Sequence, residues 1–250
     1  MKKSVIAASL AALVSANVQA DVVGVYLGGQ VWDNQASGIF GESGHQTDFN
    51  LSDEQQESFF IAVEHPLPLI PNAKISFTNL DTTGLVTLTS DIDFANETFS
   101  QGTAVETMFD VSYVDYTLYY EIFDNGLFSF DLGLSVRDLD GDITVATQTD
   151  TPTTGVNAID AMIPMLYVAT KIGLPLTGLN LMAEGNFLSV GDNTLYDYQA
   201  GISYELIDNL AVDMDVTFGY RALKLELDDV DDIYSDLDFK GIYAGTVIHF

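Results

Sequence analysis

Apolar and polar residues alternate with period two along most of the chain, which is the pattern of β-strands that bury one face. In the segment 114–122, Val, Tyr, Leu, Tyr and Ile alternate with Asp, Thr, Tyr and Glu. The same alternation returns in 128–137, 196–206 and 210–221. Each run covers about 10 residues, the span of a tilted transmembrane strand, whereas globular strands average about 5 to 6. The pattern therefore predicts long strands that keep charge off one face.

This alternation predicts an all-β fold, namely a transmembrane antiparallel up-and-down β-barrel. Bacterial single-chain barrels have an even number of strands, and the chain divides into ten, with eight as the alternative count. The segment 85–94 could extend the third strand into an outer loop. The ten predicted strands are 22–33, 57–65, 72–82, 106–123, 127–139, 159–173, 178–190, 194–207, 209–227 and 239–250.

The connections between these strands alternate between tight and long, which predicts how the barrel is oriented. Short turns face the periplasm in outer-membrane barrels and longer loops face outward. Both termini are therefore predicted to be periplasmic. The tight connections are 65–72, 123–126, 173–178 and 207–209, and the long ones are 34–56, 83–105, 140–158 and 228–238, with a short fifth near 191–193.

One segment interrupts the regular alternation. After Tyr220 the apolar positions change phase to Leu223, Leu225 and Leu227. We interpret this change as a β-bulge near Arg221–Ala222, because an extra residue in one strand moves the following side chains to the opposite face.

The first twenty residues have the features of a secretory signal peptide. Lys2 and Lys3 precede a short apolar run at 5–14, and the segment 18–20 has the small-x-small form of a cleavage site. Cleavage is predicted after Ala20, so that residues 21–250 form one barrel domain. The apolar run is too short to span a bilayer.

The chain is strongly acidic, with 37 Asp and Glu against 8 Lys and Arg. Without the signal peptide's two lysines the formal charge is −31, which excludes nucleic acid as a partner. Since 47% of residues are hydrophobic and 11% aromatic, the acidity does not indicate disorder. The four long loops contain no Lys or Arg, so the outer face is predicted to be acidic.

Two interpretations of this acidic face remain open. It is a surface kept soluble by like charge, or a weak divalent-cation surface that bridges to lipopolysaccharide phosphates. Asp138, Asp140 and Asp142 in "DLDGD" are weak calcium candidates, but the full EF-hand spacing and the distal Glu are absent. We interpret this segment as an acidic turn, and no cofactor is expected.

The inward faces of the predicted strands carry ionisable side chains that require partners in a narrow lumen. We expect them to form pairs or hold water, so that a lumen filled by side chains is favoured over a narrow cation-preferring pore. The predicted lumen charges are Asp115, Glu121, Asp131, Arg137, Lys171, Glu184, Glu205, Asp213, Asp215 and Arg221, together with Glu64 and Lys74.

Catalysis is not expected from this sequence. Of the three histidines, His65 lies in a predicted periplasmic turn and His249 is the penultimate residue. Only His45 falls on the outer face, near Ser43 and Asp48, in a glycine-rich loop with no strand to position it. The chain is therefore expected not to be an enzyme.

The chain ends on Phe250, with Ile248 two residues before it. This ending resembles the terminal signature by which outer-membrane barrels are recognised for assembly, so the assembly machinery is an expected partner. The last strand is predicted to pair with the first, which removes the sheet edges. We expect a monomer surrounded by outer-membrane lipid and lipopolysaccharide.

Three motifs, "VGVYLGGQVW", "EHPLPLIPN" and "DYTLYYEIFDN", resemble the proteobacterial outer-membrane β-barrel family with a Gly-Gly motif. The resemblance spans nearly the whole chain after residue 20. It implies an outer-membrane location and a barrel fold, and no established activity or functional residue comes with it. Three functions stay open: a structural or surface-interaction barrel, a small cation-preferring diffusion channel, and a soluble exported β-protein.

Overall fold

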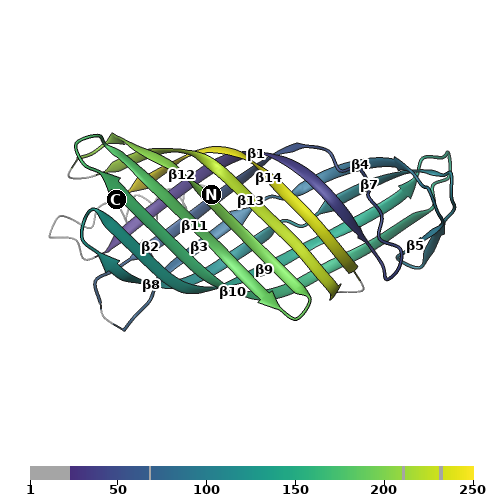
Figure 1. Ribbon diagram of the computed structural model, residues 1–250, viewed down its shortest axis with the longest axis horizontal. Helices are drawn as coiled ribbons and strands as arrows, with labels where there is room; N and C mark the ends of the chain where they lie inside the picture. Colours follow the sequence, from purple (N-terminus) through teal and green to yellow (C-terminus); the bar gives the residue numbers. More distant parts are fainter. Residues whose placement is uncertain (1–22, 68, 210–211, 231–232) are drawn as a thin grey trace, which may run out of the picture.

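The computed structural model describes residues 23–67, 69–209, 212–230 and 233–250 as a long barrel of tilted antiparallel strands (Figure 1). The predicted signal peptide and its cleavage site lie outside the described residues. Among the described residues, no helix is long and apolar enough to cross a membrane.

Ten strand positions close the barrel, and the predicted count of ten is confirmed. Each strand pairs antiparallel with its neighbours, and β14 pairs with β1 from Tyr26↔His249 to Gly41↔Tyr234. The strands of the closed barrel are β1 (Gly24–Gly41), β2 (Glu54–Glu64), β3 (Asn72–Thr78), β8 (Tyr113–Asp124), β9 (Phe128–Thr147), β10 (Thr154–Leu174), β11 (Leu179–Val190), β12 (Asn193–Ile207), β13 (Asp213–Val230) and β14 (Ile233–His249).

Four further strands lie at the end opposite the C-terminus, at the right of Figure 1. The strand β4 (Asp81–Thr87) follows β3 after two residues, and β7 (Ala104–Asp110) precedes β8 by two. They pair with each other, and β7 also pairs with the outer part of β9. The short strands β5 (Ile92–Phe94) and β6 (Glu97–Phe99) form a separate hairpin at this tip.

Parts of all four predicted long loops are extended strand, which corrects the sequence-based boundaries. The strand β1 continues to Gly41, β9 to Thr147 and β13 to Val230. The "DLDGD" segment therefore lies within β9 and is not an acidic turn. For the strands predicted at 22–33 and 127–139, the prediction ended where the apolar outward face ended, but backbone pairing continues beyond that point.

The apolar face of the longest strands changes sides between the two halves of the barrel. In the half near the C-terminus, Leu134 points outward and is 69% exposed, while Arg137 points inward and is fully buried. Farther along β9 the outward positions include Asp140, and the inward positions include Ile143 and Val145, both fully buried. A barrel that leaves the membrane meets water on its outside, so its apolar side chains must then face inward.

This inversion replaces the bulge that we predicted near Arg221–Ala222. The β12–β13 register is continuous from Thr194↔Glu226 to Glu205↔Asp215, so no extra residue occurs there. The apolar positions change phase because Leu223 and Leu225 turn into the barrel interior, where they are 0% and 2% exposed.

The inward apolar side chains of the outer half form one hydrophobic core together with loop residues. This core fills the barrel interior beyond the membrane-facing half. Its members include Trp32, Phe40, Phe49, Leu80, Phe94, Phe99, Val105, Phe109, Ile143, Val145, Leu223, Leu225, Leu237 and Phe239.

Candidate functional site

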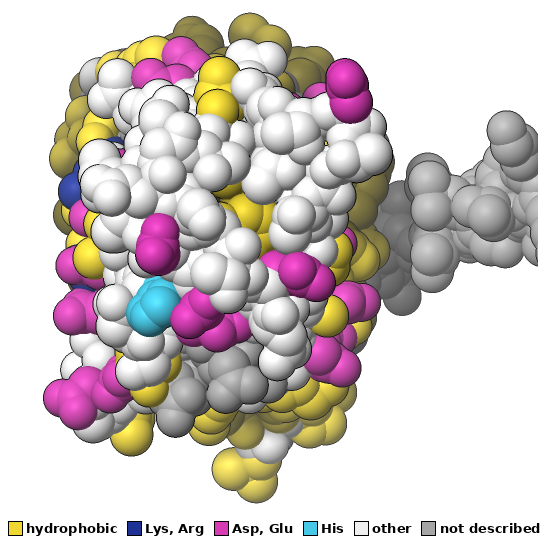
Figure 2. Space-filling view, turned by 90° about the vertical axis from the view of Figure 1, so that its right-hand side faces the viewer, with side chains coloured by type: hydrophobic (Ala, Val, Ile, Leu, Met, Phe, Trp, Pro, Cys, Tyr) yellow, Lys and Arg dark blue, Asp and Glu magenta, His cyan; other side chains and the backbone are white. Residues whose placement is uncertain are grey.

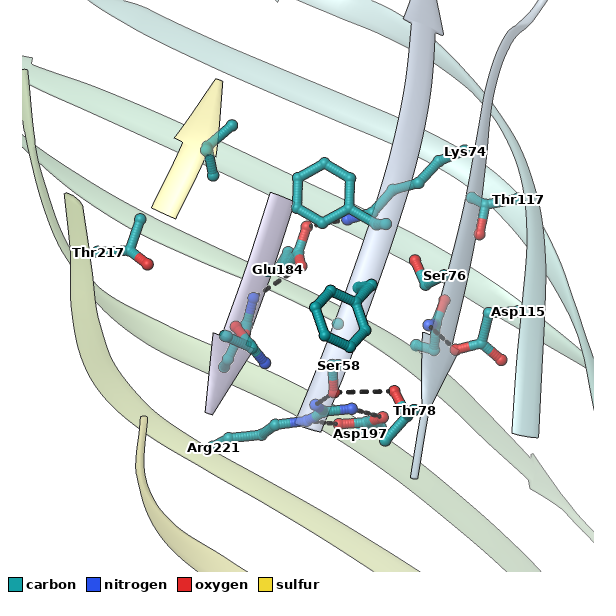
Figure 3. Close-up of a pocket in the computed structure, with 18 of the residues that line it drawn as sticks. Ser58, Lys74, Ser76, Thr78, Asp115, Thr117, Glu184, Asp197, Thr217 and Arg221 are labelled. Atoms are coloured by element: carbon teal, nitrogen blue, oxygen red, sulfur yellow. Dashed lines mark hydrogen bonds and ion pairs between the residues drawn. The ribbon is translucent and has the colours of Figure 1, made fainter. Parts of the chain in front are cut away.

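Two buried arginines and two buried aspartates span the lumen just below the hydrophobic core. Arg137 on β9 donates from Nε and Nη2 to the two carboxylate oxygens of Asp115 on β8, both at 2.8 Å. Arg221 on β13 donates from Nε and Nη2 to the two oxygens of Asp197 on β12, at 2.9 and 2.7 Å. A further bond of 2.9 Å from Arg137 Nη2 to Asp197 Oδ2 joins the two pairs. Figure 3 shows part of this network.

Aromatic and hydroxyl side chains complete the cross-section. The Tyr113 hydroxyl donates to Asp197 Oδ2 at 2.6 Å, and its ring centroid lies 3.5 Å from the guanidinium carbon of Arg137. Arg221 Nη1 donates to Ser58 Oγ at 2.9 Å, and its guanidinium lies 4.9 Å from the Trp32 ring. Since these groups come from β1, β2, β8, β9, β12 and β13, they connect walls on opposite sides of the barrel.

The four charges of this network cancel, and all four side chains are almost completely removed from solvent. Bidentate arginine–carboxylate pairs are the strongest of the common ion pairs. Removing one partner of a buried pair is destabilising, since it leaves the other charge unpaired in a medium of low polarity. The network therefore connects the strands across the lumen and leaves little free space in the lumen at this level.

Below the network lies a polar cavity of about 120 Å³ (Figure 3). Lys74 Nζ donates to Glu184 Oε2 at 2.8 Å, and Gln199 Nε2 donates to Glu184 Oε1 at 2.8 Å. The buried atoms Gln199 Oε1 and Asn186 Oδ1 have no hydrogen-bond partner among the described residues. A polar cavity of this size with unpaired acceptors has room and partners for several ordered waters.

The remaining predicted lumen charges lie toward the C-terminal end. Lys171 pairs with Asp215 at 3.3 Å, and the Tyr119 hydroxyl donates to Glu64 at 2.7 Å. The other predicted lumen charges lie opposite another acidic residue on the neighbouring strand, or beside a histidine. These are Glu121 opposite Asp131, Glu205 opposite Asp215, and Asp213 at 3.5 Å from the His249 imidazole.

The sequence-based set of lumen charges omits Asp197, the residue that bonds to both arginines. Its inward position was available from the alternation in 194–207, where Asp197 shares a face with Gln199 and Ser203. The sequence also did not indicate Tyr113 as a hydrogen-bond partner of Asp197, because the two residues meet across the lumen.

The two lysines on β13 and β14 that point outward lie beyond the apolar outer surface. Lys224 pairs with Asp236 at 2.8 Å, and Lys240 pairs with Asp238 at 3.1 Å. Each lysine donates a hydrogen bond to its carboxylate, and this bond raises the pKa of the lysine. Both lysines therefore stay charged at neutral pH, and their acidic neighbours compensate that charge locally.

The predicted calcium candidates point outward along an extended strand. Successive outward positions on a strand are about 7 Å apart, so Asp138, Asp140 and Asp142 cannot all reach one cation. Within the described ranges, no group of three or more His, Asp and Glu side chains could hold a metal ion.

His45 lies at the outer end and contacts a residue that the sequence did not indicate. Its Nδ1 accepts a hydrogen bond of 2.7 Å from the backbone N–H of Asp93. Asp48 instead accepts from the backbone N–H of Asn50, so it does not orient the imidazole.

The outer surface of the half near the C-terminus is apolar around the barrel. Exposed side chains on this surface include Phe59, Leu118, Leu134, Leu181, Ile202 and Phe218. A closed barrel with an apolar outside and a polar inside is the arrangement of a membrane-spanning barrel. The chain is a transmembrane-type β-barrel.

The chain matches no protein-family model, and no curated protein matches it. The resemblance to the Gly-Gly-motif family therefore stays a prediction.

Several solved structures are similar across most of their length. The transport unit of the autotransporter AIDA-I from Escherichia coli has a TM-score of 0.40 and 8% identity, over 94% of this chain and 91% of that one. The CymD monoaromatic hydrocarbon channel has a TM-score of 0.35 and 7% identity, over 92% and 88%. The outer membrane protein AlkL has a TM-score of 0.35 and 9% identity, over 94% of both.

Proposed function

We propose that this chain is an integral outer-membrane β-barrel with a structural or surface-interaction role and no through-going pore. The observation that carries this proposal is the filling of the interior. Above the arginine–aspartate network the lumen is occupied by the hydrophobic core, which includes fully buried Trp32 and Phe40. A diffusion channel would need a continuous path for water through both layers.

A sealed lumen is expected to show no conductance. The purified chain, reconstituted into planar bilayers, should give no reproducible single-channel steps, because both the ionic network and the core block the passage of hydrated ions. An unrelated open porin in the same bilayers serves as the control for reconstitution. Reproducible steps of constant size from the folded chain would contradict the sealed lumen and favour the cation-preferring channel.

The apolar outer surface favours the membrane barrel over a soluble exported β-protein. Leu118, Leu134 and Phe218 are each more than half exposed, and contiguous apolar surface of this extent is unstable in water.

The membrane location is tested by fractionation and gel migration. The chain is expected in the outer-membrane fraction, and the folded form should migrate differently on a gel before and after boiling, because closed barrels resist detergent until heated. A chain that stays in the soluble periplasmic fraction and migrates identically in both samples would contradict the proposal.

No enzymatic activity is part of this proposal. His45 accepts a backbone hydrogen bond at Nδ1, and the Asp93 carboxylate lies 3.8 Å from that atom, beyond hydrogen-bond distance, so the arrangement lacks the orienting acid of a catalytic triad. The lipid and lipopolysaccharide partners, the assembly machinery and the monomeric state remain part of the same proposal. Phe250 supports the assembly signal by its position, since its backbone bonds to Val25 at the closing β1–β14 seam.

A further inference from the structure

An open hollow of about 720 Å³ lies at the outermost end of the molecule, away from the lumen. We name it the tip pocket. Three separate parts of the chain line it: the loop after β1, the β5–β6 hairpin and the outer part of β10, together with Tyr234 at the start of β14. Its volume falls within the range of about 300–1,000 Å³ that is typical of small-molecule sites.

The lining of the tip pocket is acidic. Glu42 and Asp93 contribute carboxylates, and no Lys or Arg is among its described lining residues. The surrounding segments 34–56, 83–105 and 140–158 also contain no Lys or Arg. Figure 2 shows this end of the molecule, with Asp and Glu side chains distributed around a histidine. The local field therefore attracts cations and repels anions.

The two carboxylates are held in place by bonds to the opposite segment. Glu42 Oε1 accepts a hydrogen bond of 2.6 Å from the backbone N–H of Ala95, and Asp93 Oδ1 accepts one of 2.7 Å from the Thr98 hydroxyl. The second oxygen of Glu42 has no hydrogen bond from the described residues, and the second oxygen of Asp93, Oδ2, lies 3.8 Å from His45 Nδ1. Groups that are already ordered lose less conformational entropy when a ligand binds.

The imidazole of His45 adds a donor to this set. Because Nδ1 accepts the Asp93 backbone N–H, the proton of the neutral ring is on Nε2. The lining also includes the amide of Asn96 and the hydroxyl of Ser43. A ligand would therefore meet two carboxylates together with neutral polar groups.

We propose that the tip pocket binds a small organic cation that carries primary ammonium groups. An ammonium group offers several N–H donors to the two carboxylates, which makes charge-assisted hydrogen bonds of the stronger kind. A bare metal ion fits less well, because the described residues provide no group of three or more metal-ligating side chains. A phosphate or sulfate would be repelled by Glu42 and Asp93.

The test uses the full chain in detergent, with spermidine as the probe and titration calorimetry as the measurement. Saturable binding to one site is expected. The double variant Glu42→Gln with Asp93→Asn keeps the shape of the pocket and removes its charge, and it should weaken binding by at least about tenfold. A neutral polyol of similar length should not bind.

The matched control is the double variant Asp140→Asn with Asp160→Asn, which removes the same charge from the outer face of β9 and β10 outside the pocket lining. Its affinity for spermidine should stay within about twofold of the parent chain, because neither side chain lines the pocket and salt screens charges that a bound ligand does not contact. Heat-modifiable migration shows that each variant is folded. Equal weakening by both double variants, binding of the polyol with similar affinity, or absence of saturation would each overturn the site.

Discussion

Replacing Asp197 by alanine is expected to lower the free energy of unfolding by about 3–5 kcal/mol, the largest single effect that the structure predicts. Asp197 accepts hydrogen bonds from Arg137, Arg221 and Tyr113. Without it Arg221 loses its carboxylate partner and stays in a site where it is 6% exposed. Arg137 keeps its bidentate pair with Asp115, so the unpaired charge is on Arg221.

The measurement is urea unfolding in lipid vesicles, followed by tryptophan fluorescence. Trp32 is the only tryptophan, and its ring lies 4.9 Å from the Arg221 guanidinium, so its emission reports directly on this layer. The control is Asp160→Ala, an exposed outward position on β10, which should change stability by no more than about 0.5 kcal/mol.

A second variant separates the loss of a charge pair from the loss of packing. Asp197→Leu combined with Arg221→Met removes both charges of one pair, so that no unpaired charge is left on Arg221. Such replacements of whole buried pairs are often neutral or stabilising, and the double variant should recover part of the loss. A double variant as unstable as Asp197→Ala would show that the charge balance is not what this layer requires.

Much of this layer was accessible from the sequence, and the reason for the remainder is geometric. Alternation placed Asp115 and Arg137 on inward faces, and the tight turn at 123–126 made them members of one hairpin, where they lie directly opposite. The Arg137–Asp197 bond joins residues 60 positions apart, on β9 and β12. The period-two alternation shows which face of a strand a side chain is on. It does not show the level of that side chain along the barrel axis, because the strands are tilted and staggered.

The strand boundaries failed for a different physical reason. The prediction treated the apolar face as outward along the whole strand, so it ended the strands at 22–33 and 127–139 where that face became polar. In β9 the outward positions change from apolar, as at Leu134, to acidic, at Asp138 and Asp140. The inward positions change from polar to apolar, at Leu139 and Ile143. The backbone pairing stays the same at this point, but the surroundings of the barrel change from lipid to water.

The point at which the apolar face changes from outward to inward should therefore mark the membrane boundary on a long strand. Charged substitutions on either side of this point should differ strongly in their effect on stability. Leu134→Lys is expected to destabilise the barrel by about 2–4 kcal/mol, the cost of a cation on the lipid face near the bilayer midplane. Leu134 lies directly opposite Leu118 and Leu166, at the centre of an apolar patch with no charge to pair with a lysine.

Asp140→Lys is the matched control, since it introduces the same side chain on the same face of β9 six residues farther on. Asp140 is exposed and lies opposite Asp160, so a lysine there replaces like-charge repulsion with attraction and should leave stability unchanged or slightly higher. Urea unfolding of both variants in the same vesicles gives the comparison. Equal destabilisation by the two lysines would place both positions in the same environment and refute the boundary, because only a change of solvent between Leu134 and Asp140 makes one cation costly and the other harmless.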